Sequence, residues 1–98
     1  MPEIYRDEKR KEFLNLKQGI MSIAEYEVKF NQLSHYASFM IATERDKCQK
    51  FKEGLNYEIR SKITTSDLES FSKLKTAAIR AERLGKEKLV QQTRKTGF

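Results

Sequence analysis

The stretch Phe13–Ala37, FLNLKQGIMSIAEYEVKFNQLSHYA, decides the fold class of this chain. Its apolar side chains recur at steps of 3, 4, 3 and 4 residues, at Ile23, Tyr26, Phe30, Leu33 and Ala37. This is the spacing of one face of an α-helix. Ser22 and Glu25 in front form a capping box, in which the hydroxyl accepts a backbone N–H and the carboxylate reaches back. We therefore predict a helix over residues 23–37.

Similar spacing on both sides of this stretch predicts four further helices. The first runs from about residue 3 to 16, with Gly19 as its C-terminal cap, and the third closes at Gly54. The later helices follow residues that favour N-terminal caps, which are Thr43, Asn56 and Ser70. The last helix passes Gly85 as a solvated extension, and residues 91–98 are expected to fray.

These elements predict an all-α fold, a compact bundle of four to five helices. The chain has only 4 glycines and 1 proline among 98 residues, and no period-two alternation indicates a strand. The side chains expected to be largely buried are Tyr26, Phe30, Leu33, Phe51, Leu55, Ile59, Phe71 and Leu74.

Catalytic and metal chemistry find few candidates in the sequence. The single cysteine, Cys48, excludes an internal disulfide and a cysteine zinc cluster, and it lies on an apolar helix face. The single histidine, His35, has no cysteine or carboxylate partner at helical spacing and is expected at the surface. We predict no enzyme activity, no cofactor, no metal and no small-molecule substrate. No apolar run is long enough for a membrane span, and a cytoplasmic location is expected.

The net charge of +6 is concentrated near the C-terminus. Residues 67–98 contain eight basic and four acidic residues, whereas the rest of the chain is close to neutral. We therefore divide the chain into a helical domain, 1–84, and a basic, partly helical or frayed tail, 85–98. The candidate nucleic-acid-binding residues are Arg83, Lys86, Lys88, Arg94 and Lys95. They predict weak, non-specific contact with RNA, although a solvated tail that binds nothing fits the composition equally well.

An apolar connector between the second and third predicted helices is the candidate self-association site. The residues concerned are Phe39, Met40 and Ile41. No helical stripe accounts for them, so an exposed contact patch is one interpretation and a buried loop at the base of the bundle is the other.

The quoted stretch resembles the Gag region of gypsy-type LTR retrotransposons, and the similarity continues through the blocks FKEGL, EIR and FSKL to cover about residues 3–84. The Gln-Gly step and the helix after it are also similar to the major homology region of retroviral capsid C-terminal domains. The residues that match this region are Gln18, Gly19, Glu25, Tyr26, Lys29 and Phe30.

The resemblance implies a fold of the retroviral-capsid C-terminal-domain type in which these residues form a rigid brace. It implies homotypic self-association, as a homodimer or capsid lattice in a retrotransposon particle. A truncated copy is expected, because neither an N-terminal capsid lobe nor a zinc knuckle is found in the chain. Two alternatives stay open: a small basic helical RNA-binding protein, and a domesticated Gag adaptor that binds a host protein.

Overall fold

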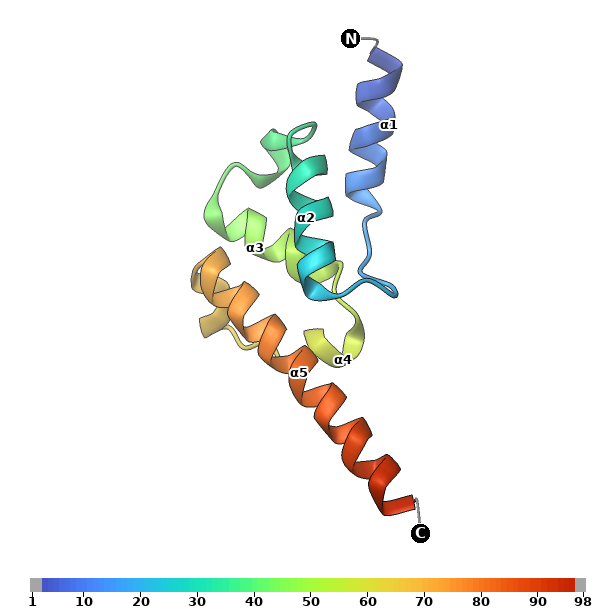
Figure 1. The fold of residues 1–98 in the computed structure, drawn as a ribbon. Coiled ribbons are helices and arrows are strands. Elements are labelled where there is room, and N and C mark those ends of the chain that lie inside the picture. The colour runs from blue at the N-terminus through green and yellow to red at the C-terminus, as the bar shows by residue number, and fades with distance from the viewer. Residues whose placement is uncertain (1–2, 97–98) are drawn as a thin grey trace.

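The chain forms five α-helices and two short 3-10 helices, with no strand in residues 3–96 (Figure 1). The computed structural model describes the backbone of residues 3–96 and the side chains of residues 3–86. The helices are α1 Glu3–Leu14, α2 Ile23–Ser34, η1 Ser38–Ile41, α3 Glu44–Glu53, α4 Tyr57–Arg60, η2 Ser66–Glu69 and α5 Phe71–Thr96. The predicted all-α architecture is confirmed.

A cluster of aromatic rings from four of the helices forms the centre of the core. The Phe30 ring of α2 lies 5.1 Å from the Phe13 ring of α1 and 5.2 Å from the Phe51 ring of α3. Phe71, at the start of α5, contacts the same group at 5.0 Å from Phe51. Aromatic pairs at these distances add to the stabilisation from buried apolar area, so this cluster fixes how α1, α2, α3 and α5 pack.

Seven of the eight residues expected to be largely buried are fully in the core, and the eighth, Phe71, is partly buried and packs against it. One face of its ring contacts Phe30 and Phe51, while the Lys47 ammonium lies 4.2 Å from the ring centroid. A lysine can cover an aromatic face through a cation–π contact and keep its charge in water. Phe71 therefore closes the edge of the core.

The predicted helix ends differ from the observed ones in the first half of the chain. Helix α1 ends at Leu14, two residues early, and residues 15–22 form a loop. Gly19 lies in this loop with a φ of +55°, so its freedom to adopt positive φ serves a turn and does not cap α1. Helix α2 ends at Ser34 because Ala37 N–H bonds back only three residues, to the Ser34 carbonyl, and the chain then turns into η1.

Carboxylates from distant segments complete the N-termini of two helices. Phe71 N–H, the first of α5, donates to Glu44 Oε2 at 2.9 Å, and Ile23 N–H, the first of α2, donates to Glu82 Oε2 at 2.9 Å. A carboxylate at a helix N-terminus satisfies a free N–H and complements the positive end of the helix dipole. These bonds tie α5 to the starts of α2 and α3.

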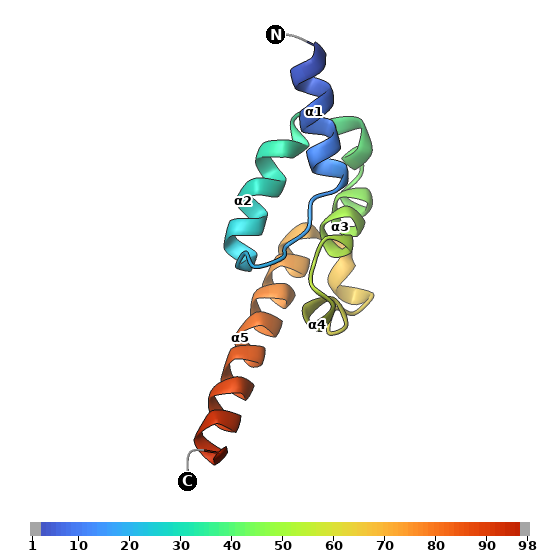
Figure 2. The same cartoon turned by 90° about the vertical axis from the view of Figure 1, so that its right-hand side faces the viewer.

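The C-terminal half of α5 projects from the bundle, so the molecule is elongated (Figures 1 and 2). Its principal extents are 59 × 28 × 16 Å. The helix continues through Gly85 to Thr96, over part of the segment that the sequence predicts to fray. No helix in the described part of the chain is both long and apolar enough to cross a membrane.

Candidate functional site

The loop between α1 and α2 is fastened to the junction of α3 and α4 by Gln18, whose side chain is only 3% exposed. Its Nε2 donates to the Met21 carbonyl at 2.9 Å, across the turn, and its Oε1 accepts the Asn56 N–H at 3.1 Å. The Gln18 backbone N–H donates to the Gly54 carbonyl at 2.8 Å. A buried amide with donors and acceptors satisfied in this way holds two chain segments in one register.

Asn56 strengthens the same junction, and this corrects its predicted role. The sequence predicts that its side chain caps α4, but Nδ2 donates to the Gly19 carbonyl at 2.8 Å, and no side-chain cap bond is present at α4. The side chain reaches across to the loop because Gly19 turns its carbonyl toward it. Asn56 thus donates two hydrogen bonds to the loop, one to Gln18 and one to Gly19, which are 38 and 37 residues away in sequence.

Tyr26 links α2 to the end of α3 beneath this junction. Its hydroxyl donates to the Phe51 carbonyl at 3.0 Å, and burial raises the pKa of the Tyr26 phenol, with the nearby Glu53 carboxylate adding to the effect. Gly54 is required by this approach: a Cβ there would lie 2.8 Å from the Leu16 carbonyl oxygen and would overlap the Tyr26 hydroxyl. Any residue could adopt the φ of −85° at Gly54, so the backbone conformation does not require glycine there. The close approach of Tyr26 and Leu16 does.

The remaining matched residues lie on α2. Phe30 is buried in the aromatic centre, and Lys29 is exposed. The Ser22 hydroxyl accepts the Glu25 N–H at 3.2 Å, as the capping box predicts, but Glu25 itself is exposed. The carboxylate that accepts a free N–H at this end of α2 is Glu82, which the sequence did not indicate because it lies 59 residues from Ile23.

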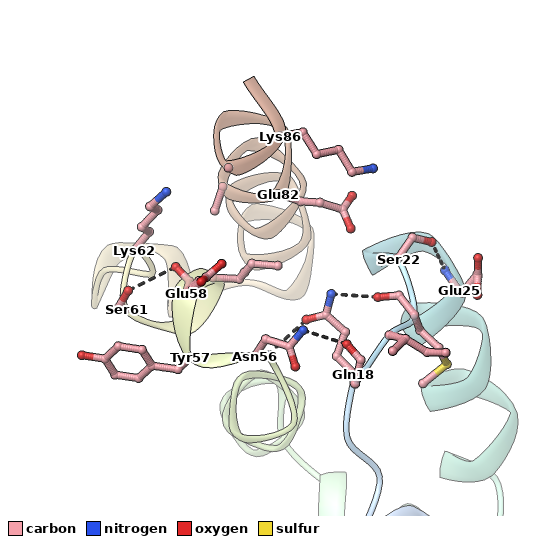
Figure 3. A pocket seen from close by; sticks show the side chains of 16 residues that line it. Gln18, Ser22, Glu25, Asn56, Tyr57, Glu58, Ser61, Lys62, Glu82 and Lys86 are labelled. Carbon is pink, nitrogen blue, oxygen red and sulfur yellow. Dashed lines mark hydrogen bonds between the residues drawn. The ribbon is translucent and has the colours of Figure 1, made fainter. Parts of the chain in front are cut away.

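A hollow of about 710 Å³ opens between this loop, α4 and α5 (Figure 3). Apolar parts of Met21, Ile59 and Ala81 line it together with charged side chains, which are Glu25, Glu58, Lys62, Glu82 and Lys86. Ile20 at its edge is fully exposed. The lining contains neither histidine nor cysteine.

The residues that sequence analysis tested for catalysis lie apart. His35 is exposed and Cys48 is buried, and burial raises the pKa of the Cys48 thiol. Within residues 3–86, no three His, Cys, Asp or Glu side chains gather as metal ligands.

The candidate self-association residues share one short helix, η1, but differ in exposure. Phe39 is 68% exposed, whereas Met40 and Ile41 are half-buried and pack against the core. The Arg10 guanidinium of α1 lies 5.7 Å from the Phe39 ring centroid, and its Nε donates to the Tyr36 carbonyl at 2.9 Å. Phe39 therefore lies against Arg10 with most of its ring in solvent.

The candidate nucleic-acid residues follow α5 outward from the bundle. Arg83 and Lys86 are exposed on the described part of this helix. The side chains of Lys88, Arg94 and Lys95 lie outside the described residues, although the backbone at these positions is helical. Their placement along a projecting helix separates the tail charge from the bundle (Figure 2).

Residues 10–84 match the protein family described as PEG10/RTL1, C-terminal capsid-like domain. The matched range begins in α1 and ends in α5, so it contains the aromatic centre and the Gln18 junction. No curated protein and no solved structure matches the chain.

Proposed function

The chain belongs to the PEG10/RTL1 C-terminal capsid-like domain family, and from this premise we propose that it acts by binding further copies of itself. Membership gives a Gag-derived, structural capsid function, and self-association is the activity that such a function requires. We place this association in the cytoplasm and propose that the Gln18 junction, with Tyr26 and Phe30, is the rigid brace on which the contact surface depends.

The observation that carries the proposal is the exposure of Phe39. Aromatic side chains that become buried in a pocket of the partner contribute much of the binding energy of an interface. Phe39 is 68% exposed in the single chain and is available for such burial. The backbone of η1 is anchored to the bundle, because Met40 and Ile41 on the same turn pack against the core. An aromatic side chain has only two torsions to order on binding, so Phe39 is suited to a weak and reversible contact.

We define the self-association surface as Phe39 together with Arg45 and Asp46, two of the exposed residues of α3. Helices η1 and α3 pack against one another, so these residues belong to one rigid part of the fold. A two-fold arrangement brings the same surface of both copies together and is the commonest symmetry of soluble oligomers. Capsid-like shells then gain strength from many such weak contacts.

Substitution of Phe39 by Glu tests the surface directly. The wild-type chain is expected to show a concentration-dependent rise in mass by size-exclusion chromatography with light scattering, over a series that reaches the millimolar range. Phe39→Glu is expected to remain monomeric and to keep its helical circular dichroism. Met40 and Ile41 are unsuitable probes because their substitution disturbs the core as well as the surface.

Leu84→Glu is the matched control, because Leu84 is an exposed apolar residue on the projecting half of α5. It introduces the same charge and is expected to leave dimerisation unchanged. Equal loss of association in both variants would trace the effect to charge and not to the Phe39 surface. A wild-type chain that stays monomeric at every concentration would contradict self-association by this chain and favour an adaptor that binds a host protein.

A weak, non-specific RNA contact through the tail is the second proposed function. The supporting observation is that α5 carries residues 83–96 away from the bundle as a helix, with Arg83 and Lys86 exposed. Deletion of residues 86–98 is expected to weaken RNA binding and to leave the helical core folded. With about four to five phosphate contacts, log K falls by about 3–3.5 per tenfold rise in salt on single strands. An RNA affinity that is unchanged by the deletion would contradict this role of the tail.

A further inference from the structure

A basic recess lies on the folded bundle, where the α1–α2 loop, α3 and α4 meet. Its volume is about 460 Å³, and its lining consists of Lys17, Gln49, Lys52, Glu53 and Arg60. Lys17 belongs to the loop, Lys52 to the last turn of α3 and Arg60 to the last turn of α4. Three cations from three segments therefore converge on one hollow that contains a single carboxylate.

The positive charge of this recess is largely uncompensated. None of its three cations takes part in the salt bridges found among the described residues. Lys50, on the same helix as Lys52, donates from Nζ to the Leu14 carbonyl at 2.9 Å. The pKa of its ammonium is lowered by burial, Glu53 opposes the shift, and the positive charge of Lys17 adds to it.

Helix chemistry alone accounts for only part of this cluster. Cations in a last helical turn interact favourably with the negative end of the helix dipole, which gives Lys52 and Arg60 a structural role. Lys17 lies in no helix, so this reason does not apply to it. A loop lysine directed to the same place as two helix-terminal cations is the arrangement expected of an anion site.

An exposed aromatic ring lies beside Arg60 of the recess. It belongs to Tyr57, which itself lines the neighbouring hollow of about 710 Å³. Tyr57, the first residue of α4, is 73% exposed, and the Arg60 guanidinium carbon lies 5.9 Å from its ring centroid. Sequence periodicity placed most aromatic residues in the core, but Tyr57 points outward (Figure 3). Exposed aromatic rings beside cationic grooves provide stacking surfaces for the bases of single-stranded nucleic acids.

We propose that this recess binds single-stranded RNA, with phosphates held by Lys17, Lys52 and Arg60 and one base stacked on Tyr57. Guanidinium groups donate paired hydrogen bonds to phosphate, and lysine provides compact charges around them. The site is separate from the Phe39 surface and from the tail. It places RNA on the rigid core of the capsid-like domain, where occupancy does not depend on residues 86–98.

Fluorescence anisotropy with a labelled ten-nucleotide oligouridylate tests the site on the full chain. The recess variant carries Lys17→Gln, Lys52→Gln and Arg60→Gln. A charge-matched control carries Lys11→Gln, Lys29→Gln and Arg80→Gln, three exposed cations outside the recess and outside the Phe39 surface. Both variants lose three positive charges, so long-range attraction falls equally and only local contacts differ.

We expect the recess variant alone to reduce the salt dependence, by about two units in the slope of log K against log salt, because each phosphate contact contributes about 0.7 on single strands. Equal affinity and slope in the two triple variants would overturn the site, since net charge would then explain all binding. The recess substitutions are then repeated in a chain that also carries Lys88→Gln, Arg94→Gln and Lys95→Gln. If they lower RNA affinity there by the same factor, the recess is a site separate from the tail. Complete loss of RNA binding after the tail substitutions alone would overturn it.

Tyr57→Ala provides an independent readout that leaves the charge unchanged. Stacking of one base is worth enough that its loss lowers affinity about fivefold or more, with the salt slope preserved. An unchanged affinity would overturn the stacking role, as would equal binding of a ten-base-pair RNA duplex, whose bases are not free to stack. Because Tyr57 and Lys17 are exposed, Tyr57→Ala and Lys17→Gln remain decisive even if the triple variant fails to fold.

Discussion

Replacement of Gln18 by Leu isolates the hydrogen bonds that join the α1–α2 loop to the α3–α4 junction. The two side chains are similar in size, so the change mainly removes the bonds to the Met21 carbonyl and the Asn56 N–H. Each such bond contributes about 0.5–1.5 kcal/mol net, and a buried partner left unsatisfied costs about 1–3 kcal/mol. Since both bonds are only partly buried, we expect a total loss of about 2–3 kcal/mol in the free energy of unfolding.

Thermal unfolding followed by circular dichroism measures this loss. For a chain of this size, about 2–3 kcal/mol corresponds to a fall of roughly 8–20 °C in Tm. Gln32→Leu is the control, because Gln32 is exposed on α2 and a surface change of this kind stays within about 0.5 kcal/mol. A Gln18→Leu protein that melts with the Gln32→Leu control would refute the argument, because the loop would then be held by apolar contacts alone.

Three further substitutions test the core and the end of α3. Phe30→Ala is expected to cost about 3–5 kcal/mol in denaturant unfolding, as for other fully buried phenylalanines, and an unchanged midpoint would contradict the packing. Gly54→Ala is expected to cost about 1–3 kcal/mol, because the added Cβ overlaps Tyr26 and Leu16. Gly85→Ala is the control, because the space around Gly85 is open. Tyr26→Phe removes the bond to Phe51 and costs about 1 kcal/mol at neutral pH. Because the folded pKa of Tyr26 is raised, the stability that Tyr26 contributes is fully present below about pH 10 and is lost as the pH rises further, and this alkaline loss is expected to be absent in Tyr26→Phe.

The sequence predicted those features of the fold that depend on local chemistry. The spacing of Ile23, Tyr26, Phe30 and Leu33 fixed α2 and its buried face, because an amphipathic helix needs only its own periodicity to be recognised. Thr43 and Ser70 were likewise predicted as caps, and each accepts a backbone N–H three residues ahead. The Gag-like sequence blocks lie on these helices. They predicted a Gag capsid family, and the family match over residues 10–84 confirms it.

Several contacts of the candidate site could be decided only by tertiary structure. Asn56 has the sequence signature of a cap, yet its side chain bonds to Gly19, because the two residues are brought together by packing and not by local geometry. Glu82 meets the start of α2 only because α5 crosses it, and periodicity along one helix carries no information about such a crossing.

Exposure was the other property that the sequence left undecided. Phe39 and Tyr57 are both aromatic, and composition alone places such residues in a core. Each lies on a short turn of helix whose neighbouring residues, Ile41 and Ile59, supply the apolar contacts instead. The direction of a side chain on a one-turn helix depends on how that turn is anchored to the bundle. The sequence by itself therefore determined the helices and the family, while tertiary packing decided which side chains are left for a partner.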